Sequence, residues 1–469
     1  MAGRVSLMRE TLIYTVGSFG SKILSFLLVP LYTFYLTKSE MGEYDLFMTS
    51  IALFVPIVSL QLSDAVYRWL VEIDEEETRE RMLPTVFTSS FLLLLITYAV
   101  FSLGFIGYCQ LFGMNNAVVF LILLMLSSML PFLQSVLRGL GKTKEFAISG
   151  LVTTLLIVGL NIILFLFFTV SVKGALIANI VGFGLSSLLI VVKLNLNKCF
   201  KIEAFDVQLV KKMLLYSLPL IPNLISWWLI SSASKFIILD KLGIEANGVY
   251  AIANRFPSML VLINSVLILP IQDSLLKQRS DFQYFISIVQ RFVRFELIVV
   301  VLLSVGSPIY VKFMVEDSFY EAWMYMPFLF LGVGFNTLAS VIGIIYQKEK
   351  KTMRITVTTV IGGIISILLS FLLVSEFGLM GISLSFFAGY LIMFLLRTID
   401  LRHKLNFKAF LPSDMLVFFG FILIMYLQII LEFKMQLLLF IITMFFLFFY
   451  YRVDIQKAYN SIRKNKETI

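Results

Sequence analysis

The sequence predicts an all-α polytopic membrane protein with about 14 transmembrane helices, and composition is the first observation behind this prediction. Of its 469 residues, 59 % are hydrophobic and only 14 % are charged. A soluble domain is typically about 45–50 % apolar and about 25 % charged. The mean hydropathy is +0.94. This composition excludes a soluble enzyme, a secreted disulfide scaffold and a disordered chain.

Long apolar runs are the second observation. A membrane-spanning helix needs about 20 mostly apolar residues, and the chain holds fourteen such runs. Only helices and closed barrels satisfy the backbone in lipid, and these runs lack the alternation of barrel strands. The predicted spans are 11–36, 43–70, 83–109, 116–138, 146–169, 174–193, 215–239, 247–270, 286–311, 321–346, 353–374, 378–397, 412–431 and 435–451.

The first of these runs is predicted to be a transmembrane helix that stays in the mature protein. Arg4 and Arg9 precede the apolar residues Leu12 to Leu36. The apolar part of a signal peptide has only about 7–15 residues and ends at a small-residue cleavage site. This run is longer and has no such site.

The placement of lysine and arginine is the third observation, and it orients the helices. With both termini in the cytoplasm, most of the 38 basic residues fall in connections on the inner side. This is the positive-inside pattern of membrane proteins. The net charge of +9 therefore reflects topology and not nucleic-acid binding. The outer connections hold only Lys38, Lys173, Lys241, Lys312 and Lys434.

Two halves of the chain repeat each other at a nearly constant offset. Because each copy has six helices, both copies lie the same way up, which implies a pseudo-twofold axis along the membrane normal. Two similar bundles leave a cleft between them that can open to either side, as in a transporter. No filter-like loop of glycine and aromatic residues indicates a channel. The matched positions are Gly42 with Gly248, Gly174 with Gly381, and Gly182 with Gly389.

The repeat also predicts the domain organisation. No loop is long enough to form a folded domain, so the chemistry is expected within the membrane. The predicted parts are an N-terminal six-helix bundle over 1–195, a cytoplasmic linker over 196–214, a C-terminal six-helix bundle over 215–400, and two additional helices with a basic cytoplasmic tail over 401–469.

Several motifs give the chain a family resemblance. The stretch Leu215–Asn223, followed by Trp227 and Trp228, and the stretch Asn247–Arg255 resemble Wzx-type polysaccharide flippases of the multidrug/oligosaccharidyl-lipid/polysaccharide exporter superfamily. One departure is that many relatives carry Asp-Arg where this chain has Ser234-Lys235. Only the positive member of that pair survives here.

The resemblance implies a transporter and not an enzyme. Such a protein moves polyprenyl-diphosphate-linked oligosaccharide repeat units from the cytoplasmic to the outer leaflet by alternating access, for surface polysaccharide biosynthesis. It further implies a multi-pass protein of the bacterial cytoplasmic (inner) membrane, in contact with membrane lipid and the polysaccharide polymerase machinery. No cofactor is implied.

Four basic residues inside predicted spans are candidates for substrate binding. A charge at the centre of a helix costs about 2.5–3.5 kcal/mol on insertion scales, so it is a functional candidate. The diphosphate of the implied substrate is a dense anion that arginine and lysine bind well. For Arg68 and Lys235 the competing interpretation is snorkelling to the interfaces. The candidates are Lys22, Arg68, Lys235 and Arg255.

Acidic and aromatic residues supply the remaining candidates. The acidic candidates for proton or sodium coupling are Asp45, Asp64 and Glu296. For Asp64 the alternative is a pair with Arg68 on one helix face, because the two residues are four positions apart. Trp227 and Trp228 could stack on sugar rings or pack against lipid and helices. The single histidine, His403, argues against a histidine metal site or a catalytic triad, and no metal site is predicted.

Other functions compete with the flippase. A cation-coupled, multidrug-type exporter of small molecules would be expected to have an acidic cavity, whereas Lys22 and Arg255 are basic. A polysaccharide polymerase or ligase would need a large outer loop with catalytic residues, which the short outer connections do not provide. A flippase of the peptidoglycan precursor would carry a lipid with a similar headgroup, so this function remains an alternative.

Overall fold

A computed structural model describes residues 20–21, 23–73, 76–112, 117–168, 171–277, 282–349, 351–405 and 412–452. Within these ranges the protein is all-α, with no β-strand, as predicted. Nine of the described helices are long and apolar enough to cross a membrane, or ten if one bent pair counts as a span. The protein is therefore a multi-span membrane protein. The number of fourteen spans remains a prediction.

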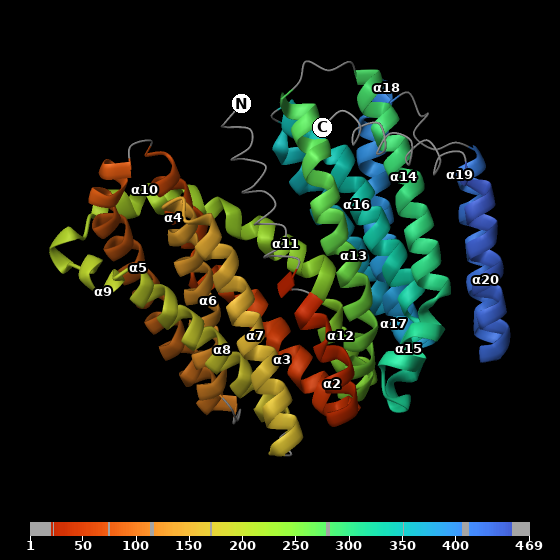
Figure 1. The fold of residues 1–469 in the computed structure, drawn as a ribbon, viewed down its shortest axis with the longest axis horizontal. Coiled ribbons are helices and arrows are strands. Elements are labelled where there is room, and N and C mark those ends of the chain that lie inside the picture. Colours follow the sequence, from red (N-terminus) through yellow and green to blue (C-terminus); the bar gives the residue numbers. More distant parts are fainter. Residues whose placement is uncertain are drawn as a thin grey trace, which may run out of the picture. The chain divides into compact units, whose positions relative to one another are not determined.

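The chain divides into two compact units, Met1–Ala251 and Ile252–Ile469. In the first unit the long helices α5 to α8 lie side by side (Figure 1). The helices of this unit are α2 (Leu28–Tyr35), α3 (Lys38–Val58), α4 (Leu62–Val71), α5 (Glu76–Phe112), α6 (Ala117–Gly139), α7 (Thr143–Phe167), α8 (Val172–Lys193), α9 (Leu196–Cys199), α10 (Val207–Ser217), α11 (Ile221–Ser232) and α12 (Ser234–Leu242), with 3-10 turns η1 (Ile202–Ala204) and η2 (Leu218–Leu220).

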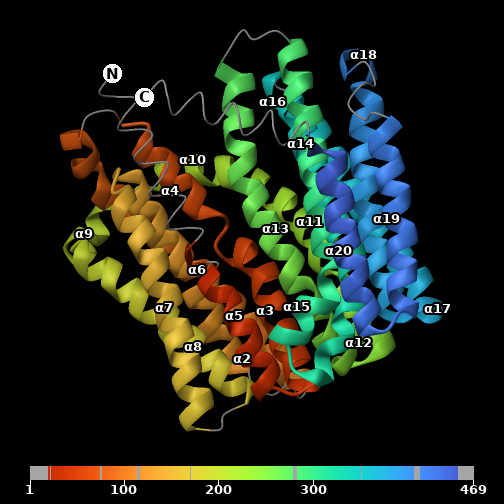
Figure 2. The ribbon, with the colours of Figure 1, turned by 45° about the vertical axis from the view of Figure 1, so that its right-hand side comes forward.

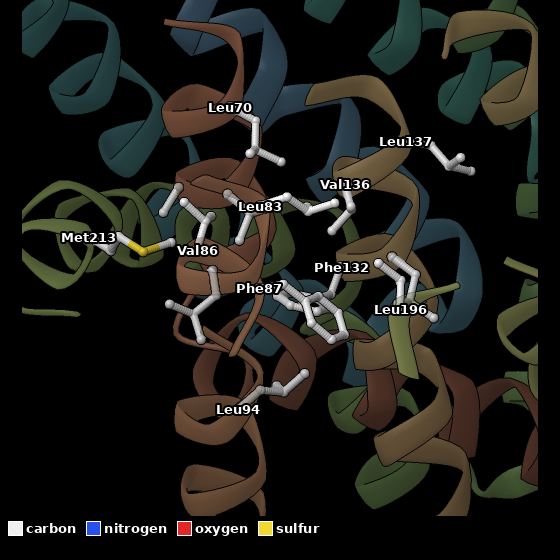
Figure 3. Packing of buried hydrophobic residues seen from close by; sticks show 14 of the residues in the cluster. Leu70, Leu83, Val86, Phe87, Leu94, Phe132, Val136, Leu137, Leu196 and Met213 are labelled. Atoms are coloured by element: carbon white, nitrogen blue, oxygen red, sulfur yellow. The ribbon is translucent and has the colours of Figure 1, made fainter. Parts of the chain in front are cut away.

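An apolar core holds one end of this unit together. Side chains of α4, α5 and α6 meet there with residues of α8, α9 and α10 (Figure 3). Gly139 of α6 lies so close to α4 that an added Cβ would be 2.6 Å from the Cβ of Leu70. Because lipid tails are as apolar as leucine, such close packing is what holds membrane helices together.

The second unit is a set of long helices that begins partway along α13. The unit boundary falls inside this helix, between Ala251 and Ile252. Helix α16 packs against both α14 and α17, and α19 and α20 run along α14 (Figure 2). The helices are α13 (Ile244–Lys277), α14 (Phe282–Val305), α15 (Ser307–Met314), α16 (Met326–Lys348), α17 (Thr352–Asp400), α18 (Arg402–Leu405), α19 (Pro412–Ile430) and α20 (Phe433–Tyr450), with 3-10 turn η3 (Asp317–Met324).

Three predicted spans are interrupted in the structure. The span 43–70 ends as α3 at Val58, two residues after Pro56, which lacks a backbone donor. Leu60 and Gln61 then take left-handed conformations before α4 begins. The span 286–311 is bent by 54° between α14 and α15, and the span 215–239 is divided at Ala233 between α11 and α12.

Helix α17 is a hairpin of two antiparallel segments, as the separate spans 353–374 and 378–397 predict. Gly378 breaks the helix with a φ of 53°, a conformation that glycine adopts without a steric penalty. Residues on opposite sides of this turn meet: an added Cβ at Gly362 would lie 2.8 Å from the Gly389 carbonyl oxygen, and Arg354 pairs with Asp400.

The predicted domain limits at 195, 214 and 400 remain predictions. The compact units place α10, α11 and α12 with the first unit, because α10 packs on α4 and α5 and α11 packs on α3.

Candidate functional site

A buried ion pair lies in the first unit, between the candidate residues Lys235 and Asp45. The Lys235 Nζ is 2.8 Å from the Asp45 Oδ2, and it also donates to Asp45 Oδ1 at 3.0 Å and to Thr49 Oγ1 at 3.2 Å. The exposed fractions of the two charged side chains are only 9 % and 10 %. We call Asp45, Thr49, Lys235 and Asn247 the ion-pair cluster.

Two glycines bring the helices of the ion-pair cluster together. An added Cβ at Gly42 of α3 would lie 2.1 Å from the Ile244 carbonyl oxygen, and one at Gly248 of α13 would lie 2.0 Å from the Lys38 carbonyl oxygen. No side chain fits at either position, so the two backbones touch. Gly42 and Gly248 are matched positions of the predicted repeat, and so are Lys38 and Ile244. This reciprocal contact supports the repeat, whose complete arrangement remains a prediction.

Polar side chains around the contact form hydrogen bonds with several of the buried groups. The Asn247 amide donates to the Gly42 carbonyl oxygen at 3.2 Å and to Asp45 Oδ2 at 3.5 Å. The Trp228 indole N–H donates to the Thr49 carbonyl oxygen at 3.0 Å. This tryptophan also packs on Phe236, with ring centroids 5.8 Å apart. The ion-pair cluster thus ties α3 to α11, α12 and α13.

The ion pair changes the interpretation of Lys235. The sequence suggests an uncompensated cation, because the neighbouring acidic residue of the relatives is Ser234 here. The structure shows that Asp45, 190 positions earlier, supplies the negative charge. Burial without this partner would be strongly unfavourable. Lys235 therefore neither snorkels to an interface nor presents a free charge in this conformation.

The predicted pairing of Asp64 with Arg68 is wrong. The Arg68 Nε instead lies 2.9 Å from Glu72 Oε1, and its side chain is 47 % exposed. Its guanidinium also lies 4.4 Å from the ring centroid of Tyr216. Asp64 accepts a hydrogen bond of 2.9 Å from the Gln61 side chain. Gln61 is the residue just before α4, so this second bond depends on the helix start that follows the interruption after Val58.

Within the described part of the chain, Arg255 is the candidate cation without an acidic partner. It is half-buried on α13, inside the predicted span 247–270. Among the described residues, no carboxylate lies within ion-pair distance of its guanidinium. Trp227 is half-buried on α11. Lys22, the other basic candidate near the middle of a span, lies outside the described residues.

Glu296 belongs to a second polar cluster, in the second unit. Its carboxyl group is 1 % exposed and accepts a hydrogen bond of 2.8 Å from the Asn264 amide. The same amide donates to Thr337 Oγ1 at 2.8 Å. We call Asn264, Glu296 and Thr337 the carboxyl cluster. It joins α13, α14 and α16. Among the described residues, no group of three or more His, Cys, Asp or Glu could hold a metal ion.

Sequence reasoning missed several polar partners. Asn247, Thr49, Asn264 and Thr337 are buried polar residues in apolar helices, and their rarity in lipid was the signal that could have found them. Arg397 was expected in a cytoplasmic connection but is 1 % exposed. Its guanidinium donates to the Ala339 carbonyl oxygen at 2.8 Å and to the hydroxyls of Thr358 and Thr359, each at 3.0 Å.

The chain is similar to a known protein family and to several solved membrane proteins. A family model described as "Polysaccharide biosynthesis protein" matches residues 7–276. No curated protein sequence matches the chain. The solved lipid II flippase MurJ in an inward closed conformation is 16 % identical, with a TM-score of 0.68 over 95 % of this chain and 100 % of that one. An inward-facing multidrug resistance MATE family transporter of the MOP superfamily is 17 % identical, with a TM-score of 0.60 over 84 % and 94 %. At these identities the likeness shows a shared fold.

Proposed function

The chain belongs to the polysaccharide biosynthesis protein family, and on that premise we propose that it is a lipid-linked oligosaccharide flippase. It moves polyprenyl-diphosphate-linked oligosaccharide repeat units from the cytoplasmic to the outer leaflet by alternating access, for surface polysaccharide biosynthesis. The family and the structural neighbours are transporters and flippases, not catalytic enzymes, which supports transport as the activity.

Arg255 carries this proposal. A half-buried guanidinium inside a membrane helix, with no carboxylate beside it in the described part of the chain, attracts an anion. A diphosphate offers several oxygens to the planar fork of an arginine. The other intramembrane cations of the described chain do not serve equally well, because Lys235 is neutralised by Asp45 and Arg397 donates its N–H groups to carbonyl and hydroxyl oxygens.

The rest of the substrate has separate contacts in this proposal. Lys22 is the second cation for the diphosphate. Trp227 and Trp228 stack on sugar rings; Trp228 offers only its ring faces, because its N–H is already bonded to Thr49. The lipid tail stays in the bilayer. Arg68, exposed beside Glu72, binds headgroups at the end of α4 and not in the transport path.

The proposal includes a location and an orientation. We place the protein in the bacterial cytoplasmic membrane with both termini inside, as the distribution of basic residues predicts. The polysaccharide polymerase machinery is the expected partner on the outer side, because it would use the oligosaccharide that the flippase delivers.

Deletion of the gene tests the function. In the deletion strain, a polyprenyl-diphosphate-linked oligosaccharide should accumulate on the cytoplasmic leaflet, and the chain should restore its export. The variant Arg255→Ala should insert normally but fail to restore it, whereas Arg291→Ala should restore it fully. Arg291 is a matched control because it is an exposed arginine bonded to Ser287. If no lipid-linked glycan accumulates, the flippase proposal is wrong and an exporter of small molecules becomes the better account.

A further inference from the structure

The carboxyl cluster of the second unit holds more hydrogen-bond acceptors than donors. The Asn264 amide nitrogen uses both of its hydrogens, one toward Glu296 Oε1 and one toward Thr337 Oγ1. The Thr337 hydroxyl in turn donates to the Val333 carbonyl oxygen at 2.8 Å. Glu296 Oε2 and Asn264 Oδ1 are both buried, and neither has a hydrogen-bond partner.

No cation compensates Glu296 within the described chain. Its carboxyl group forms no ion pair there, and among the described residues its one hydrogen bond is with the neutral Asn264 amide. Gly334 of α16 lies beside the carboxyl group, because a Cβ added there would be 3.7 Å from Glu296 Oε1. The other charged side chains on helices packed with it lie at other positions of those helices. They are Glu245 and Arg255 on α13, Arg291 and Arg294 on α14, Lys348 on α16 and Lys434 on α20.

One bound proton removes the uncompensated charge and adds a donor to the carboxyl cluster. A buried ionised carboxylate without a counter-ion is very unfavourable, whereas the neutral acid is not. Protonation of Oε2 also creates a donor among oxygens that have none. A fully buried carboxyl group that still has an unpartnered oxygen is unusual in folded proteins, where such groups are normally satisfied.

We propose that Glu296, held by Asn264, is a proton-binding site in the membrane interior, and that its loading and release are coupled to the transport cycle. This proposal rests on the proposed flippase function for its physiological meaning. The present conformation is the proton-loaded one. Release requires a conformation in which water reaches Glu296, so protonation stabilises the sealed arrangement of α13, α14 and α16. Proton movement down its gradient can then set the direction of transport.

Infrared spectroscopy tests the proton site without any transport assay. We expect the purified full-length protein in lipid nanodiscs at neutral pH to show the carbonyl stretch of a protonated carboxylic acid. Glu296→Gln should remove this band, and Glu296→Asp should shift it. Glu245→Gln should leave it unchanged, because Glu245 is exposed at the start of α13. Glutamine keeps the acceptor for Asn264, so the variant should fold. Absence of the band in the wild type, or its persistence in Glu296→Gln, would overturn the proposal.

A second experiment tests the coupling. Vesicles of a flippase-deletion strain that contain the wild-type chain should deliver lipid-linked glycan faster when a proton gradient is imposed, and Glu296→Gln should lose this response while Glu245→Gln keeps it. A response to sodium in place of protons would reject a proton site. If no glycan is delivered by any variant but the infrared band behaves as expected, the flippase function fails and the proton site stands.

Discussion

Removal of Asp45 should destabilise the first unit more than any exposed charge change does. The Lys235 ammonium contacts both carboxylate oxygens of Asp45, at 2.8 and 3.0 Å, and Thr49 at 3.2 Å. In Asp45→Ala only the Thr49 hydroxyl remains, so a buried cation loses its counter-charge. Breaking a buried pair in this way costs about 3–5 kcal/mol.

A double-mutant cycle of Asp45→Leu, Lys235→Met and the two combined separates this cost from the value of the pair itself. Asp45→Leu combined with Lys235→Met removes both charges and leaves apolar side chains of similar reach. Replacing both partners of a buried ion pair is often nearly neutral, so the double variant should be far more stable than Asp45→Ala. Residues in direct contact are expected to show such non-additivity.

The free energy of unfolding can be measured for each variant by titrating purified protein in mixed micelles with increasing SDS. Glu72→Ala is the matched control, because Glu72 pairs with the exposed Arg68 and such pairs contribute about 0–1 kcal/mol. If Asp45→Ala lies as close to the wild type as Glu72→Ala does, Lys235 is not held by a buried ion pair and this part of the account is refuted.

Three further predictions test other parts of the structure. Gly42→Ala should lower the free energy of unfolding by about 1–3 kcal/mol, because the added Cβ would lie 2.1 Å from a backbone oxygen. The control Gly104→Ala has open space around the added Cβ and should not lower thermal stability. Arg397→Lys should lower the free energy of unfolding by about 1–3 kcal/mol, since one ammonium cannot replace the guanidinium bonds; an unchanged value would show that these bonds add nothing. Partial burial raises the pKa of the Cys199 thiol above its ordinary value, so maleimide labelling of the folded protein at neutral pH should be slower than that of a free thiol and should accelerate as the pH rises. Labelling as fast as a free thiol would contradict this burial.

The positions of the helices could be predicted from the sequence, because a helix that spans lipid has to be a long apolar run. The ranges 116–138 and 146–169 coincide closely with α6 and α7, and the separate spans on either side of Gly378 correspond to the two arms of α17. The interruption after Val58 could not be predicted in the same way. Apolar residues continue through it, and proline in a membrane helix does not by itself decide between a kink and an end.

The candidate site was predicted at the level of residues but not of partners. Asp45, Lys235 and Glu296 were predicted as functional candidates, because charged residues within apolar runs are rare and costly. The Lys235 partner comes from 190 positions away, and no local pattern encodes such a contact. The match of Gly42 with Gly248 was a long-range signal in the sequence, and these two glycines do meet. Which cations have an acidic partner depends on such contacts, so the neutralisation of Lys235 by Asp45 could be found only in the structure.

Reconstituted flipping tests the central claim most directly. The glycolipid recovered from the deletion strain would be incorporated into proteoliposomes, and its appearance in the opposite leaflet would be followed by enzymatic trimming of the exposed sugar. The account predicts transfer with the wild-type chain and with Arg291→Ala, and none above protein-free liposomes with Arg255→Ala. Equal transfer by wild type and Arg255→Ala would contradict a diphosphate held by this arginine, and no transfer by the wild-type chain would contradict the flippase itself.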